Sequence, residues 1–158
     1  MKPKLYLESS IPSYLVARPT RDVVIAGNQA LTRQWWSSQL GRFSVFVAQV
    51  VLDEVSAGDP VMASQRLELL KPFPQLVITP EAETLAQALV QRGPLPAKAA
   101  RDALHIALAA VHQMHFLLTW NCRHIANAQM LRQVSVVCER HGCPCPVVCT
   151  PAELMYNL

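Results

Sequence analysis

The sequence predicts a single α/β domain with helices on both faces of a small, mainly parallel sheet. Short β-branched or aromatic segments recur along the chain, and a longer segment of helical character separates each from the next. No hairpin turn signals join these segments, which favours crossover connections and parallel strand pairing. The 158 residues are 51% hydrophobic and 16% charged, which suits one compact domain over residues 1–158 with a substantial core.

In the first half of the chain, glycine and proline mark the expected helix boundaries. Pro12 suits a first helical turn, Gly41 and Gly58 end helices, and Asp59-Pro60 is a typical N-cap and first-turn pair. The elements expected here are strands over 4–8 and 43–47, and helices from 11, over 21–40, over 48–57 and over 60–70.

The second half follows the same alternation. Thr79-Pro80 opens a helix that Gly93-Pro94 ends, and residues 150–153 have the spacing of a capping box. The elements expected here are strands over 76–78, 116–119 and 147–148, and helices from 80, over 97–113 and over 123–139.

Composition limits the class of protein. The net charge is +3, and the ten arginines against four lysines permit phosphate binding, although no dense basic run demands it. The chain begins almost directly with a strand-like segment and shows no signal-peptide pattern. No window approaches the roughly 18 apolar residues of a membrane span. We therefore expect a cytoplasmic protein that does not enter the membrane.

Of four oxygen-bearing side chains, most stand where the hydrophobic pattern predicts core or core rim. Glu8 closes the first strand, Glu54 lies in the last turn of a helix, Asp102 enters an apolar helix, and Asn121 follows a later strand. A carboxylate near a helix end opposes the helix dipole, and buried carboxylates are costly unless they share a cation. Because ligands of parallel sheets bind at the carboxyl ends of the strands, the pattern predicts a site for a hard divalent metal there.

Each of these residues also has a simpler interpretation. Glu8 is alternatively a solvated strand end, and Asp102 a partner of the helix dipole, although that role leaves it short of solvent. His105, three residues after Asp102, either faces the site or is a core histidine with one hydrogen bond. Further candidates near the site are a ligand-orienting or turn-capping serine, a histidine and two arginines for phosphate contacts: Ser10, His124, Arg101 and Arg123.

Aromatic and cysteine residues leave further alternatives open. Trp35, Trp36 and Trp120 either stack on bases or pack in the core, with packing favoured for the adjacent pair. Five cysteines lie in the last quarter of the chain: Cys122, Cys138, Cys143, Cys145 and Cys149. We expect free thiols in a reducing compartment, with structural zinc as the alternative, although zinc ligands usually come in more widely separated pairs.

Four segments together resemble PIN-domain proteins, particularly the toxin half of bacterial type II toxin–antitoxin pairs. They are YLESSIPSYL (6–15), VLDEVSAGD (51–59), RDALHIA (101–107) and LTWNCRH (118–124). They occur in the family's order across nearly the whole chain. The resemblance implies a three-layer α/β/α domain and a Mg²⁺- or Mn²⁺-dependent endoribonuclease that hydrolyses single-stranded RNA.

The resemblance also implies roles for particular residues and partners. Glu8, Glu54 and Asp102 match the family's metal-binding acids, and Asn121 matches the fourth catalytic position, as a ligand or as a residue that orients one. Family members commonly form homodimers, and toxin members are held inactive by a small antitoxin protein.

Two departures from the family pattern support an alternative. The first acid is usually Asp, whereas Glu8 carries its carboxylate one methylene further, and Asn121 is neutral where an acid is common. Three charges instead of four weaken the binding of a second cation. The alternative is a degenerate PIN domain that binds RNA or a protein partner without cutting. A nucleotide-binding protein is not favoured, because neither GxGxxG nor GxxxxGK[ST] occurs.

Overall fold

A five-stranded, all-parallel sheet forms the centre of the computed structural model, which describes residues 1–156. The strand order is β3-β2-β1-β4-β5. The strands are β1 (Lys4–Leu7), β2 (Ser44–Ala48), β3 (Gln75–Leu76), β4 (Phe116–Leu118) and β5 (Val147–Cys149). The first strand along the chain is therefore the central one, and the parallel α/β fold expected from the sequence is confirmed.

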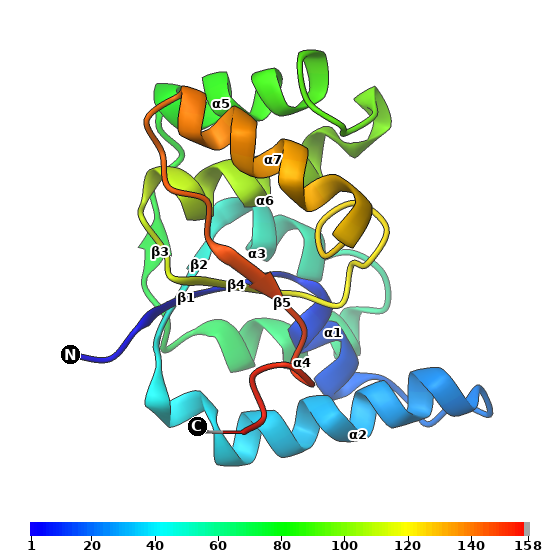
Figure 1. Cartoon of the computed structure of the whole chain (residues 1–158). Helices are drawn as coiled ribbons and strands as arrows, with labels where there is room; N and C mark the ends of the chain where they lie inside the picture. Colours follow the sequence, from blue (N-terminus) through cyan, green and yellow to red (C-terminus); the bar gives the residue numbers. More distant parts are fainter. Residues whose placement is uncertain (157–158) are drawn as a thin grey trace.

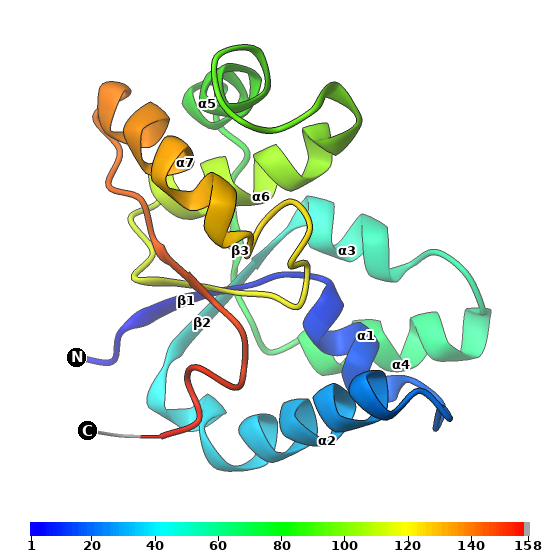
Figure 2. The same cartoon turned by 45° about the vertical axis from the view of Figure 1, so that its right-hand side comes forward.

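Seven α-helices within the described residues connect the strands and cover the sheet. They are α1 (Ser10–Val16), α2 (Val23–Ser38), α3 (Gln49–Val55), α4 (Pro60–Leu70), α5 (Pro80–Gln91), α6 (Ala100–Val111) and α7 (Ala128–Arg140). Figures 1 and 2 show α5, α6 and α7 on one side of the sheet and α1, α2 and α4 on the other, with α3 leaving the end of β2. The result is three layers. No helix among residues 1–156 is long and apolar enough to cross a membrane.

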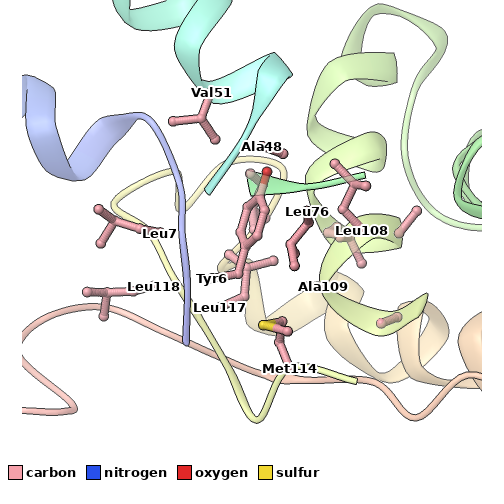
Figure 3. Close-up of a cluster of buried hydrophobic side chains, with 14 of the residues drawn as sticks. Tyr6, Leu7, Ala48, Val51, Leu76, Leu108, Ala109, Met114, Leu117 and Leu118 are labelled. Carbon is pink, nitrogen blue, oxygen red and sulfur yellow. The ribbon is translucent and has the colours of Figure 1, made fainter. Parts of the chain in front are cut away.

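The core forms where the inner helices meet the central strands. Leu5, Leu7 and Leu117 are fully buried, and α6 presents small residues such as Ala107 to its neighbours, so that helix and sheet approach closely. Figure 3 shows Tyr6 beside apolar side chains such as Leu76 and Leu117, with its hydroxyl oxygen pointing toward Ala48. A polar tip thus lies inside an otherwise hydrophobic layer, and it needs a hydrogen-bond partner there.

The strand register brings the ends of β1 and β4 together. Leu7 pairs with Leu118, and the backbone N–H of Glu8 donates to the carbonyl oxygen of Leu118 at 3.1 Å. The residues that follow the two strands are therefore neighbours, although more than a hundred positions separate them in the chain. The candidate site lies at this edge of the sheet, where β1 and β4 end.

The expected helix over 123–139 was wrong at its start, because α7 begins only at Ala128. The Asn121 side chain accepts the N–H of His124 at 3.0 Å, and its carbonyl oxygen accepts the N–H of Ala126 at 2.8 Å. Asn127 then caps α7 by accepting the N–H of Gln129. Asparagine side chains compete with helical hydrogen bonds in this way, so residues 121–127 form turns instead.

The structure also differs from the expected elements at the ends of other helices and strands. The helix expected over 21–40 begins at Val23, because Asp22 is its N-cap, and the strand expected over 76–78 is Gln75–Leu76. The helix expected over 97–113 is a 3₁₀ turn (Ala97–Ala99) followed by α6. In the expected capping box Glu153 does accept the Thr150 N–H at 3.0 Å, but turns follow it and not a helix.

Two glycines provide a paired test of this packing. A Cβ at Gly93 would lie 2.6 Å from the Leu89 carbonyl oxygen, whereas a Cβ at Gly27, inside α2, would meet nothing within 4 Å. We expect Gly93→Ala to lower the free energy of unfolding by about 1–3 kcal/mol, because the backbone must shift. Gly27→Ala should raise it by about 0.5–1 kcal/mol through helix propensity. Urea denaturation measures both, and stabilisation by Gly93→Ala would contradict the structure.

Candidate metal centre

The carboxylate of Glu8 is buried at the carboxyl end of the central strand, with 4% of the residue exposed. Its Oε1 accepts the Ser9 hydroxyl at 2.9 Å. Its Oε2 accepts the Ser10 N–H at 3.0 Å, the Thr119 hydroxyl at 2.7 Å and the Ser10 hydroxyl. These four donors offset part of the cost of burying the charge. They also leave Oε1, with its single partner, as the more available oxygen.

The hydroxyl oxygens of Ser10 and Thr119 also accept hydrogen bonds from the backbone. The Trp120 N–H donates to the Ser10 hydroxyl oxygen at 2.8 Å, and the Asn121 N–H donates to the Thr119 hydroxyl oxygen at 2.9 Å. Since each hydroxyl oxygen accepts from the backbone, each is free to turn its proton toward Glu8. The loop after β4 and the turn after β1 are therefore joined through one carboxylate.

Glu54 lies in the last turn of α3, the helix that follows β2, and its carboxylate lies close to that of Glu8. Its Oε1 accepts the Ser9 hydroxyl at 3.1 Å and lies 2.5 Å from the Nε2 of His105. Partial burial would raise the pKa of Glu54, but the hydrogen bond and charge of His105, the hydrogen bond from Ser9 and the charge of Arg101 outweigh it, so its pKa lies below the ordinary value. Glu54 is therefore a carboxylate at neutral pH.

A buried chain of hydrogen bonds links Tyr6, His105 and Glu54. The Tyr6 hydroxyl lies 2.7 Å from the Nδ1 of His105, which is fully buried. Burial, followed by the charges of Glu8 and Glu54, raises the pKa of Tyr6 well above its usual value, so the hydroxyl keeps its proton. Within residues 1–156, Nδ1 of His105 is the polar atom in hydrogen-bond contact with that hydroxyl. On the other side of the ring, Nε2 of His105 donates to the Glu54 carboxylate, which has no proton of its own to give.

Together these contacts define one compact group. Single ligand atoms of Glu8, Glu54 and His105 all lie within 4.8 Å of one another. Among the described residues neither carboxylate has a lysine or arginine within ion-pair distance. Two carboxylates this close repel each other unless a cation or a proton lies between them. The donor set therefore fits a divalent metal ion, with the carboxylate oxygens as hard ligands.

Asp102 lies in the first turn of α6 but outside this group. Its Oδ2 is 3.1 Å from the Nδ1 of His124, and both side chains are less than one-fifth exposed. Asn121, the predicted fourth member, uses its side-chain oxygen to hold the His124 N–H. The structure thus brings Glu8 and Glu54 together directly, and it joins Asp102 and Asn121 to each other through His124.

Of the remaining candidate residues, some contact the site and others only support the fold around it. Ser10 is part of the site through Glu8, whereas Arg101 and Arg123 are exposed. Trp120 stacks on Tyr14 at 5.8 Å between ring centroids and donates from its indole nitrogen to Thr32. It therefore anchors the loop after β4.

The adjacent tryptophans pack as expected. Trp35 is fully buried and stacks on Phe43, and Trp36 packs edge-on against Phe73. All five cysteines are free thiols, and none belongs to a group of potential metal ligands within residues 1–156. Burial raises the pKa of Cys149 to about 12, so this thiol stays protonated.

Sequence reasoning missed three contributors. Tyr6 reads as an ordinary strand residue, and Thr119 and Ser9 carry no motif of their own. Each matters because of a contact with Glu8, Glu54 or His105. Only Ser9 gave a local signal, by its position directly after a strand that ends in an acid.

Comparison with protein-family models and with curated proteins finds no match for this chain. The likeness to PIN domains therefore stays a resemblance carried by the four segments and by the fold.

The buried chain gives a direct test. Tyr6→Phe removes the hydrogen-bond partner of Nδ1 of His105 and leaves this buried nitrogen unpaired, so we expect the free energy of unfolding to fall by about 1–3 kcal/mol. Tyr14→Phe is the matched control, because Tyr14 is partly exposed and its contact with Trp120 is ring stacking. Its effect should stay within about 0.5 kcal/mol. Equal effects of the two changes in urea denaturation would contradict the assigned chain.

Proposed function

We propose that this chain is a Mg²⁺- or Mn²⁺-dependent endoribonuclease of the PIN type that hydrolyses phosphodiester bonds of single-stranded RNA. The observation that supports it most is the pairing of Glu8 and Glu54 at the carboxyl edge of the sheet, where His105 contacts Glu54 and, among residues 1–156, no lysine or arginine lies within ion-pair distance of either carboxylate. A parallel α/β sheet binds its ligands at this edge. The resemblance to PIN domains places metal-binding acids at the same two positions.

In this proposal Glu8 and Glu54 hold the metal, and Asp102 supplies the third carboxylate from α6. When bound, the cation lowers the pKa of a coordinated water and offsets charge on the phosphate. The hydroxyls of Ser9, Ser10 and Thr119 keep the Glu8 carboxylate in place.

Other residues orient the acids or face the substrate. His105 holds Glu54 from the interior, and His124, ordered by Asn121, holds Asp102. The exposed Arg101 and Arg123 flank Asp102 and the β4 loop in sequence, and they would contact RNA phosphates.

We further propose that the protein is a cytoplasmic toxin that forms a homodimer and binds a cognate antitoxin. Exposed apolar side chains support a surface that a partner covers. Val23 and Val24 at the start of α2 are 84% and 71% exposed, and Val61 at the start of α4 is 67% exposed. Light scattering that shows a monomer at all concentrations would contradict the homodimer.

A non-catalytic PIN domain that binds RNA or a protein is the second candidate. Two observations favour it: Oε2 of Glu8 already accepts three hydrogen bonds, and Asp102 lies outside the compact group. If Glu8→Asp with Asn121→Asp cuts RNA where the unmodified protein does not, the site has decayed and this candidate is the correct one.

The deciding experiment is cleavage of a mixed single-stranded RNA pool by purified, antitoxin-free protein in Mn²⁺ or EDTA. We expect cutting in Mn²⁺ alone, and a reduction of at least about 10-fold in Asp102→Asn, because the third carboxylate is lost. Asp53→Asn is the matched control, since Asp53 is exposed and hydrogen-bonds to Gln49. Cutting that survives Asp102→Asn undiminished would point to a contaminating ribonuclease. No cutting by folded protein would favour the non-catalytic domain.

A further inference from the structure

A groove on the α5–α7 side of the molecule is lined by three arginines. Arg92 ends α5, and Arg132 and Arg140 lie on α7, with Gln133 and Val136 between them. Gly93, just after α5, also lines the groove, and a Cβ there would lie 2.6 Å from the Leu89 carbonyl oxygen. The two helices are in contact, and Figure 2 shows α7 in front of α6 with α5 above.

The three arginines carry uncompensated charge. Each is exposed, and none forms an ion pair with a carboxylate of residues 1–156. Glu139, an acid of α7, accepts the Ser135 hydroxyl at 3.3 Å. Arg132 and Arg140 are eight positions apart, which is about 12 Å along a helix. The groove thus offers cationic groups at intervals along its length. This spacing suits a polyanion, which carries negative charges at regular intervals.

The helix that lines the groove follows the loop that contacts Asp102, the proposed third carboxylate. The loop after β4, which carries Asn121 and His124, leads directly into α7 at Ala128. Arg132 therefore lies one turn beyond that loop, and Arg140 two turns further on. A ligand that follows α7 from Arg140 to Arg132 runs toward the loop that holds Asp102.

We propose that this groove binds the phosphate backbone of single-stranded RNA and guides it to the metal centre. That the RNA is guided to the metal centre rests on the proposed nuclease function. Binding of RNA in the groove does not depend on cleavage. Guanidinium groups pair bidentately with phosphate and stack on bases. The exposed part of Val136, 40% of the residue, gives a sugar or base an apolar contact between the charges.

The test measures binding without cleavage. A triple variant, Arg92→Gln, Arg132→Gln and Arg140→Gln, is titrated with a short labelled single-stranded RNA in EDTA by fluorescence anisotropy. We expect at least a 10-fold loss of affinity. The slope of log K against log salt should become shallower by about 2, because each phosphate contact to a single strand contributes roughly 0.7.

A second triple variant controls for net charge. Arg18→Gln, Arg21→Gln and Arg33→Gln remove the same charge from exposed positions on and before α2, in the opposite helical layer of Figure 1. We expect its affinity and salt slope to stay close to those of the unmodified protein. Circular dichroism verifies that both variants are folded. Equal losses in the two variants would overturn the groove as a specific site.

The remaining outcomes separate this inference from the nuclease proposal. RNA binding that depends on the three arginines, without any cutting in Mn²⁺, would support the groove and contradict the nuclease. Cutting by a groove variant that binds like the unmodified protein would support the nuclease and overturn the groove. Competition by poly-glutamate as strong as that by RNA would also overturn it, in favour of an acidic protein partner.

Discussion

The buried carboxylate of Glu8 is the constraint on which the rest of the site depends. A charge at the end of the central strand, 4% exposed, is unfavourable unless donors surround it. Ser9 and Ser10 supply donors from the start of α1, and Thr119 supplies one from the end of β4. The backbone of the β4 loop then bonds to the same hydroxyls. One carboxylate thus fixes two chain segments that lie far apart in sequence, and it leaves one of its oxygens available.

The hydrophobic core contributes a second, independent constraint through Tyr6 and His105. Tyr6 belongs to the central strand and lies within the apolar layer, but its hydroxyl reaches His105 on α6. The imidazole then reaches Glu54 on α3. The sheet and two helices therefore set the position of Glu54, whose carboxylate lies within 4.8 Å of a ligand atom of Glu8. Residues that are rigidly held in this way need little rearrangement to bind a cation, which is a general requirement of preorganised sites.

Much of this could be predicted from sequence, because the signals are local. The alternation of strands and helices, the N-cap residues Asp59 and Thr79, and the placement of Glu8 and Glu54 at the ends of elements are all readable along the chain. The roles of Tyr6 and Thr119 were not readable, because each depends on a partner about a hundred residues away. The late start of α7 was missed because Asn121 and Asn127 compete for backbone hydrogen bonds, which the hydrophobic pattern does not register. The position of Asp102 beside His124, outside the compact group, likewise follows from tertiary packing alone.

The central claim is that Glu8 and Glu54 share a divalent cation. A crystal structure of the protein soaked in Mn²⁺, with anomalous difference density, tests it without reference to any activity. We expect a peak within about 2.0–2.6 Å of an oxygen from each carboxylate, with His105 still bonded to Tyr6 and Glu54. A Mn²⁺ peak elsewhere, with these two carboxylates unligated at saturating metal, would contradict it.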